Sequence, residues 1–181
     1  MGFGSAISKC LSSYATFSGR ASRAEYWWFF LFLTLAGAVA SLIDWQFFTT
    51  TATVAGAGGT QVTTSVSYRP VHSIVTLALF LPHLAVAFRR MHDTGRSGLY
   101  VFLPFLMMLT ALAVIVFGIG LADLFASGGS LDILFTRLTG LTMIPILLIL
   151  VASPLLVLWW LTRPSQPGPN AYGPNPYEVT T

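Results

Sequence analysis

Long apolar stretches alternate with short polar segments along most of this chain. Four stretches contain no Asp, Glu, Lys or Arg, at residues 26–43, 71–88, 99–122 and 140–161. At about 1.5 Å rise per residue, a helix of roughly 18 residues extends about 27 Å, close to the bilayer's hydrocarbon thickness of about 30 Å. The pattern predicts an all-α polytopic membrane protein with about four transmembrane helices.

The segment before the first span predicts a short interfacial helix. Phe3, Ile7, Leu11 and Tyr14 follow one another at intervals of four, four and three residues, which places them on one helical face. A helix with one apolar and one polar face lies in the plane of the membrane surface. We therefore expect an interfacial segment at residues 1–25, followed by a four-helix membrane domain at 26–161.

Polar connectors join and follow the spans. Residues 45–70 are rich in Thr, Val and Gly, which favours a loop or a small β-hairpin outside the bilayer. Residues 123–132 are rich in Gly, Ser and Asp and predict a turn between the third and fourth spans. The tail at 162–181 is rich in Pro, Gly and Asn, which disfavour a helix and predict further turns.

Composition excludes several classes of protein. Hydrophobic residues make up 55% of the 181 residues and charged residues only 8%, against about 25% charged residues in an average soluble domain. Too few polar side chains are present to cover a soluble core. The single cysteine, Cys10, excludes an internal disulfide and a cysteine-based metal cluster, and we expect no metal or other cofactor.

The distribution of Lys and Arg predicts the orientation of the spans. With four spans, most basic residues fall on the side of both termini: Lys9, Arg20, Arg23, Arg89, Arg90, Arg96 and Arg163. Only Arg69 and Arg137 fall on the opposite side. Because basic residues accumulate in cytoplasmic segments, we expect both termini in the cytoplasm. The basic residues form no continuous stripe, so we expect no nucleic-acid partner.

Three polar strings resemble the signatures of one protein family. They are FSGRASRAEYWWFFLF at 17–32, FRRMHDTGRSG at 88–98 and GPNAYGPNP at 168–176. In this order they resemble a bacterial inner-membrane family catalogued as domain of unknown function 805 (DUF805). The resemblance implies a multi-pass inner-membrane protein and supplies no catalytic residue. The first two strings also resemble each other, because each places Gly, Arg and Ser before an aromatic span; this similarity suggests two helical hairpins related as a parallel repeat.

Charged residues at the cytoplasmic ends of the spans form the main candidate site. The cations are Arg20, Arg23, Arg89, Arg90 and Arg96, and the carboxylates are Glu25 and Asp93. In one hypothesis the guanidinium groups bind the phosphates of anionic lipid headgroups or of another ligand, and point to the membrane surface. In the other hypothesis the arginines only determine the orientation of the spans in the membrane, and their guanidinium groups turn inward to pair with the two carboxylates. For Glu25, the expected partner is an arginine of the segment 89–96.

His83 lies well inside the second span, where an ionisable side chain suggests a substrate or proton pathway. Transport requires a cavity that reaches this residue. In the alternative interpretation, a neutral His83 is satisfied by a backbone carbonyl or by a hydroxyl such as that of Thr110 or Ser153, with no functional consequence.

Catalysis finds no support in the residue pattern. The side chains of His92 and Asp93 diverge on a helix, and no nucleophile accompanies them. The sequence predicts a non-enzymatic inner-membrane protein whose basic cytoplasmic face binds anionic lipid headgroups or a partner protein. The alternative is a small transporter or channel subunit with His83 in its pathway. The expected partners are membrane lipids, and a second copy or another membrane protein is a further hypothesis.

Overall fold

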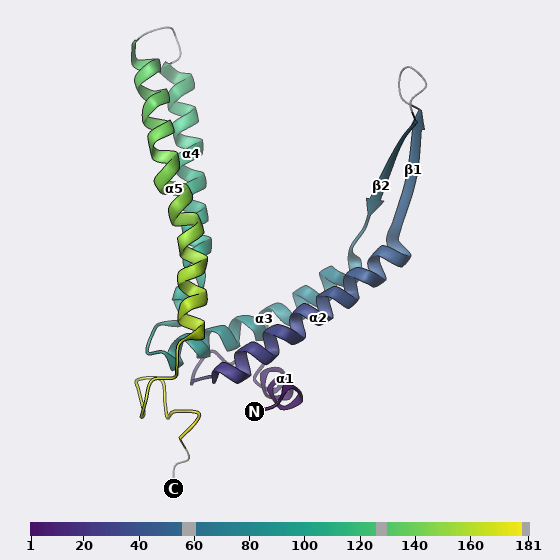
Figure 1. Cartoon of the computed structure of the whole chain (residues 1–181), viewed down its shortest axis with the longest axis vertical. Helices are drawn as coiled ribbons and strands as arrows, with labels where there is room; N and C mark the ends of the chain where they lie inside the picture. The colour runs from purple at the N-terminus through teal and green to yellow at the C-terminus, as the bar shows by residue number, and fades with distance from the viewer. Residues whose placement is uncertain (56–60, 126–129, 179–181) are drawn as a thin grey trace.

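The chain forms two antiparallel helical hairpins that meet at one end of the molecule and diverge towards the other (Figure 1). The structure is a computed structural model and describes residues 1–55, 61–125 and 130–178. Its elements in chain order are α1 (Phe3–Ser12), α2 (Arg23–Phe48), β1 (Thr49–Ala55), β2 (Gln61–Ser67), α3 (Pro70–Asp93), the 3-10 helix η1 (Gly98–Phe102), α4 (Leu103–Phe125) and α5 (Ser130–Thr162). α2 packs along α3, and α4 packs along α5.

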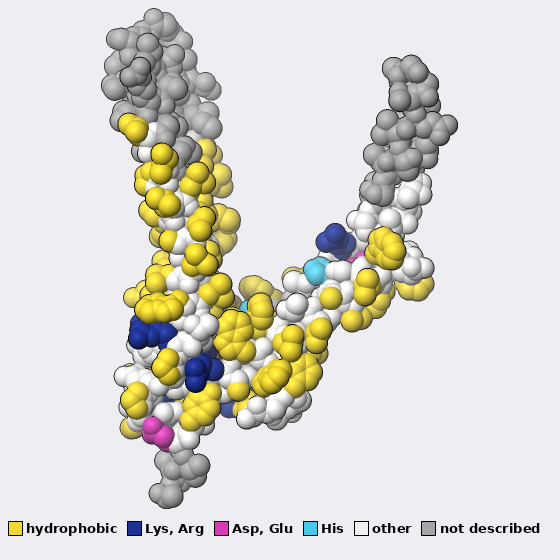
Figure 2. All heavy atoms as spheres, in the orientation of Figure 1, with side chains coloured by type: hydrophobic (Ala, Val, Ile, Leu, Met, Phe, Trp, Pro, Cys, Tyr) yellow, Lys and Arg dark blue, Asp and Glu magenta, His cyan; other side chains and the backbone are white. Residues whose placement is uncertain are grey.

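Within the described residues, four helices are long and apolar enough to cross a membrane. They cover Arg23–Phe48, Pro70–Asp93, Gly98–Phe117 and Ile144–Thr162. Their outward faces carry large exposed hydrophobic side chains, such as Leu77 at 75% exposure, and apolar atoms cover much of α4 and α5 in Figure 2. Such a surface is stable only against lipid or another protein. The predicted all-α architecture with four spans is therefore confirmed.

The connection between the first two spans differs in detail from its prediction. α2 continues through Asp44 to Phe48, beyond the predicted end at residue 43. The helix tolerates this carboxylate because Asp44 is buried and accepts backbone hydrogen bonds from the start of α3. Strands β1 and β2 then form an antiparallel hairpin from the Thr49–Ser67 pair to the Ala55–Gln61 pair. Of the predicted turn at 123–132, residues 126–129 lie outside the described part of the chain.

α1 packs against the beginning of α2 (Figure 1). The rings of Phe3 and Trp28 meet edge to face, with centroids 5.8 Å apart. Ala6 and Cys10 of α1 are fully buried. The short N-terminal helix that the apolar spacing predicts is therefore present, and it contributes to the core as well as to the surface.

The buried core lies where the two hairpins meet. It contains hydrophobic side chains from α1, α2, α3, α5 and the segment between α1 and α2, namely Cys10, Ala21, Tyr26, Phe29, Val86, Ala87, Met91, Val157 and Leu161. Away from this region, most side chains of the spans face outward.

Candidate functional site

The N-terminus, the polar ends of the two hairpins and the tail up to residue 178 lie at one end of the molecule (Figure 1), which we call the base. The base comprises residues 1–25, 88–98 and 162–178. The three strings that define the family resemblance meet here, although they are far apart in the sequence.

Asp93, at the end of α3, is the centre of a buried cluster. One carboxylate oxygen accepts a hydrogen bond from Nε of Arg20 at 2.9 Å. The other accepts hydrogen bonds from Arg90 and from the hydroxyl of Ser165. The charged side chains of this cluster are at most 1% exposed. Asp93 thus joins the N-terminal segment, α3 and the tail at one point.

The two arginines of this cluster also bind backbone carbonyls. Arg20 donates to the carbonyl oxygens of Gln166 and Gly168 at 2.6 and 2.7 Å. Arg90 donates to the carbonyl oxygens of Leu161, at 3.0 Å, and Arg163. A helix leaves its last carbonyls without partners inside the helix, and Arg90 satisfies two at the end of α5.

A second buried cluster connects α1, α2 and α3. Glu25 lies 2.7 Å from Nη1 of Arg89 and 2.7 Å from Nζ of Lys9. Glu25 and Arg89 are buried, whereas the side chain of Lys9 is 42% exposed. Cys10 is buried beside them, and burial, with the nearby Glu25 carboxylate in second place, raises the pKa of its thiol from 9.0 to about 11. The thiol is therefore protonated and poorly nucleophilic at neutral pH.

The tail folds back onto the end of α3. The ring of Tyr172 stacks on the imidazole of His92, with centroids 3.9 Å apart and planes 2° from parallel. Asn170 donates to the carbonyl oxygen of His92 at 2.9 Å, and His92 Nδ1 lies 3.1 Å from the carbonyl oxygen of Gly19. The string at 168–176 is therefore a folded part of the base.

The structure separates the five candidate arginines into different environments. Arg20 and Arg90 belong to the Asp93 cluster, and Arg89 belongs to the Glu25 cluster. Within the described residues, Arg23 and Arg96 take part in neither cluster: Arg23 is exposed, and Arg96 is half-buried. The five therefore do not form one continuous anion-binding surface.

Sequence reasoning missed several of the partners. On a continuous helix, Arg89 and Arg96 lie four residues before and three residues after Asp93 and were its expected partners. The structure pairs Asp93 instead with Arg90, three residues before it, and with Arg20. Lys9 and Ser165 also belong to these clusters and were not among the candidates. The joint presence of the three strings was the only available signal that these segments meet.

Arg96 and a further arginine, Arg163, lie over tryptophan rings near the end of α5. Arg96 is 4.9 Å from the ring centre of Trp160, and Arg163 is 4.7 Å from that of Trp159. Beside Arg96 is a groove of about 330 Å³, lined by Ser97, Leu99, Tyr100, Leu103 and Leu106. Figure 2 shows Lys and Arg side chains close to the apolar surface of the helices in this region.

His83 lines a cavity between α2 and α3 that contains none of the residues of the two charged clusters. The cavity has a volume of about 270 Å³, and its lining includes His72 as well as His83. The hydroxyls of Thr110 and Ser153, considered as partners of His83, bond instead to carbonyls of their own helices, Met107 and Leu150. Among the described residues, no group of three or more His, Cys, Asp or Glu is placed to hold a metal ion.

Four apolar helices with a polar base define a multi-pass membrane protein. The chain belongs to the family described as "Protein of unknown function (DUF805)", which matches residues 14–174. It is 36% identical over 107 residues to inner membrane protein YhaI of Escherichia coli K12, covering 59% of this chain and 76% of the relative. It is 35% identical over 113 residues to inner membrane protein YhaH of the same strain, covering 60% and 79%. No solved structure matches. The protein is thus a member of a bacterial inner-membrane family.

Proposed function

We propose that this chain is a non-enzymatic membrane protein whose base faces the cytoplasm and binds anionic lipid headgroups. The excess of basic residues at the base supports this orientation, because basic segments are retained in the cytoplasm. The cytoplasmic leaflet is also the source of an anionic surface potential.

The observation that carries the proposal is the placement of Arg96 and Arg163 over Trp160 and Trp159. Tryptophan rings favour the boundary between headgroups and acyl chains. An arginine held against such a ring is positioned at phosphate depth, and its guanidinium can bind phosphate with two parallel hydrogen bonds. The groove beside Arg96 offers apolar side chains and the Ser97 hydroxyl to a lipid bound at this point.

The buried clusters have a different role in this proposal. Arg20, Arg89 and Arg90 are held by carboxylates and carbonyls inside the protein and are not available to lipid. They hold the base in one shape, so that Arg96 and Arg163 stay at the membrane boundary. Arg23, which is exposed, adds to the local positive potential.

Lipid retention in native mass spectrometry tests the proposal. Wild type is compared with the Arg96→Gln/Arg163→Gln double variant, each extracted from nanodiscs that contain phosphatidylglycerol and phosphatidylcholine. Each arginine near an anionic surface contributes about 1 kcal/mol, so the double variant should bind phosphatidylglycerol roughly 30-fold more weakly. Binding of phosphatidylcholine should be unchanged.

Arg69→Gln provides a matched control, because Arg69 is an exposed arginine at the opposite end of α3. It should leave phosphatidylglycerol binding at the wild-type level. Equal retention by the double variant and wild type would refute the lipid site and would favour a partner protein as the ligand of the base.

The second candidate function is a small transporter or channel subunit with His83 in its pathway. One observation favours it, namely the cavity that His83 lines together with His72. Flux through reconstituted wild type and a folded His83→Ala variant tests this candidate. Equal flux in both would exclude a pathway through His83.

A further inference from the structure

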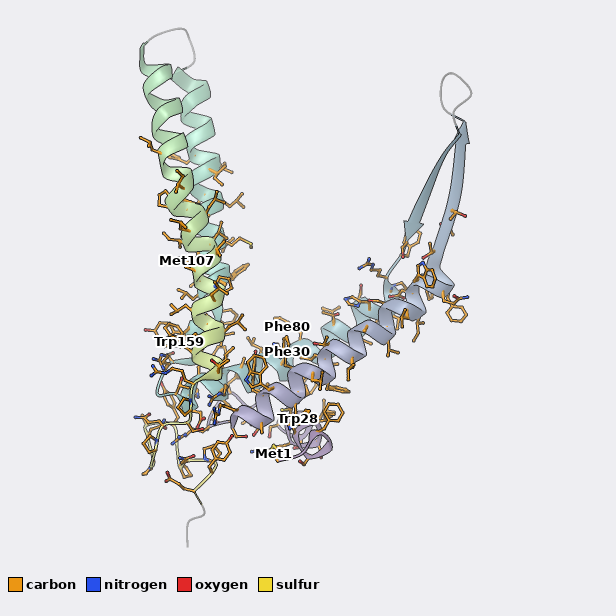
Figure 3. The ribbon with its side chains drawn as sticks, viewed as in Figure 1. Met1, Trp28, Phe30, Phe80, Met107 and Trp159 are labelled. Carbon is orange, nitrogen blue, oxygen red and sulfur yellow. The ribbon has the colours of Figure 1, made fainter. Side chains whose placement is uncertain are left out.

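An apolar groove of about 530 Å³ lies between α4 and α5 and ends towards the base. Leu103 and Met107 of α4 line it, together with residues of α5 between Ile149 and Trp159; Figure 3 labels Met107 and Trp159 on this hairpin. Ile149 and Trp159 are ten residues apart, so the groove extends about 15 Å along α5. This length is half of a hydrocarbon core of about 30 Å. The groove therefore matches an acyl chain within one leaflet.

Arg163 lies at the base end of this groove. Its guanidinium is 4.7 Å from the ring centre of Trp159, and Trp159 lines the groove. Arg163 is exposed, and among the described residues no carboxylate forms an ion pair with it. An anionic group bound to Arg163 would therefore stand at the entrance of the groove, where the headgroup of a lipid stands relative to its acyl chain.

Arg96 has a similar position at a second apolar groove. This groove has a volume of about 330 Å³, and its lining includes Ser97 and Tyr100. The Tyr100 ring meets Trp160 edge to face at 5.2 Å, and the guanidinium of Arg96 is 4.9 Å from the ring centre of Trp160. Within the described part of the chain, Arg96 has no carboxylate partner either. Leu103 lines both grooves, so the two adjoin.

The two arginines provide two phosphate positions at the same end of the α4/α5 hairpin. Trp159 and Trp160 are consecutive, so their Cα atoms are about 3.8 Å apart. At 3.6 residues per turn, their side chains diverge by about 100° around α5. Arg96 and Arg163 therefore lie over different faces of one helix. A lipid with a single phosphate forms the paired hydrogen bonds with only one of the two guanidinium groups.

We propose that Arg96 and Arg163 bind the two phosphates of one diphosphatidyl lipid, the cardiolipin class. This inference rests on the proposed lipid-binding function and names the lipid. In such a lipid a single glycerol joins two phosphatidyl groups. Each half places its phosphate at one arginine and an acyl chain in the adjoining groove, and the remaining chains stay in the bilayer. Once the first phosphate is bound, the second binds as an intramolecular event, which increases the overall affinity.

Native mass spectrometry with two lipids that carry the same acyl chain tests this proposal. The delipidated protein is titrated with tetraoleoyl cardiolipin and, separately, with dioleoyl phosphatidylglycerol at twice the molar concentration, so that the phosphate concentration is equal. We expect one cardiolipin to bind at least about tenfold more tightly than the first phosphatidylglycerol. Equal affinities would overturn the proposal and would indicate separate lipids with one phosphate each. This comparison requires no variant.

Single substitutions test whether both arginines hold the same lipid. Arg96→Gln and Arg163→Gln should each lower cardiolipin affinity to about that of phosphatidylglycerol, because either change leaves one phosphate without its arginine. Arg69→Gln, at the exposed arginine before the opposite end of α3, is the matched control and should keep the full preference for cardiolipin. A preference that survives either Arg96→Gln or Arg163→Gln would contradict a two-phosphate site.

Ala152→Trp tests the larger groove without changing either arginine. Ala152 is exposed and lines this groove, so a bulky ring there should exclude the acyl chain and weaken cardiolipin binding several-fold. Val39→Trp is the matched control: Val39 is also exposed, and it lines a groove on α2 where, among the described residues, no charged side chain is present. Unchanged affinity in Ala152→Trp would rule out an acyl chain in the groove.

The same titrations separate this inference from the proposed function. Selective binding of phosphatidylglycerol over phosphatidylcholine, with no preference for cardiolipin, would overturn only the assignment to a diphosphatidyl lipid. If neither anionic lipid bound better than phosphatidylcholine, the proposed lipid-binding function would fail as well.

Discussion

Pro82 removes one backbone hydrogen bond from the interior of α3, and a side chain from outside the helix replaces it. Proline has no N–H, so the carbonyl of Ala78, one turn earlier, loses its partner within the helix. The hydroxyl of Tyr14 donates to this carbonyl. Such replacement is required in a membrane helix, where no water is available to the freed group. Tyr14, expected only as part of an apolar face, thereby fastens the N-terminal segment to α3.

Replacing Tyr14 by Phe should destabilise the protein by about 1–2 kcal/mol, because it leaves the Ala78 carbonyl without a donor. Pro82→Ala restores the N–H at residue 82. In that background Tyr14→Phe should cost much less. Unfolding free energies of the four proteins in a double-mutant cycle measure the difference, and additive effects of the two substitutions would contradict this account.

Burial of Cys10 predicts the pH dependence of its alkylation. Its thiol pKa is raised from 9.0 to about 11, mainly by burial and secondarily by Glu25. Between pH 9 and pH 11 a free thiol is mostly ionised, whereas the Cys10 thiol stays mostly protonated because its pKa is raised. The reactive thiolate of Cys10 therefore appears only as the pH rises towards 11. At pH 8 the folded protein should react with iodoacetamide about 100-fold more slowly than a free thiol, in proportion to its thiolate fraction.

The rate of alkylation of Cys10 in denatured protein is the control for this experiment, and it should follow a pKa near 9. A folded-state rate profile with its midpoint at pH 9 would show that neither burial nor Glu25 acts on the thiol as described. Because Cys10 is the only cysteine of the chain, the measured rate belongs to this residue alone.

At the scale of elements, the similarity between the two Gly-Arg-Ser strings has a conformational explanation. Gly19 and Gly95 both adopt positive φ, at 87° and 75°, a region that favours glycine. The serine that follows then accepts a backbone hydrogen bond at the start of the next helix: Ser22 from Glu25 N at 3.1 Å, and Ser97 from Leu99 N at 3.4 Å. Each string thus ends a turn and begins the first helix of a hairpin.

The beginning of α3 depends on a residue of α2. Arg69, at the N-cap of α3, makes no side-chain capping bond. Instead, the carboxylate of Asp44 accepts hydrogen bonds from the N–H groups of Val71 and His72 at 3.0 and 2.8 Å. The negative charge also lies at the positive end of the helix dipole. Asp44, expected only to end the first span, therefore joins the outer ends of α2 and α3.

Asp44→Ala should lower the unfolding free energy by about 1–2 kcal/mol, the usual effect of removing a helix cap. Asp44→Asn keeps an acceptor oxygen without the charge, so its loss should be smaller. Steric trapping or SDS titration in bicelles measures both. Asp44 accepts with both oxygens, and asparagine keeps only one of them. Equal losses for the two variants would show that a single neutral acceptor oxygen provides no stabilisation here.

At the scale of the whole molecule, the sequence predicts the features that depend on local patterns, such as the apolar spans. It does not predict contacts between residues that are far apart in the chain. The uncharged stretches are long enough to reveal all four spans, because hydrocarbon excludes charge over a defined length. The structure also pairs Glu25 with Arg89, within the segment where its partner was sought. Arg90, three residues before Asp93 on α3, is a partner at helical spacing. The other partners of Asp93, Arg20 and Ser165, lie far away in the sequence, and no spacing encodes their approach.

The two hairpins are joined mainly at the base, where Arg90 of α3 binds carbonyls at the end of α5 and Asp93 holds Arg90 in place. Away from the base they diverge (Figure 1). Because Arg20 and Arg90 are buried beside one carboxylate, Asp93→Asn leaves two cations without a counter-charge. Loss of one partner from a buried ion pair typically costs about 3–5 kcal/mol. We therefore expect this substitution to loosen the angle between the hairpins as well as to destabilise the protein.

Electron paramagnetic resonance distances between the hairpins measure that angle. Spin labels at Trp45→Cys and Leu141→Cys, in a Cys10→Ala background, report on exposed positions of the two hairpins far from the base. Asp93→Asn should broaden the distance distribution. Glu25→Gln is the matched control, because it also removes a buried carboxylate. Glu25 connects only α1, α2 and α3, so this variant should leave the distance distribution narrow. If both variants broaden it equally, the angle depends on general stability of the base; if neither does, the angle is set by packing of the hairpins and not by the Asp93 cluster.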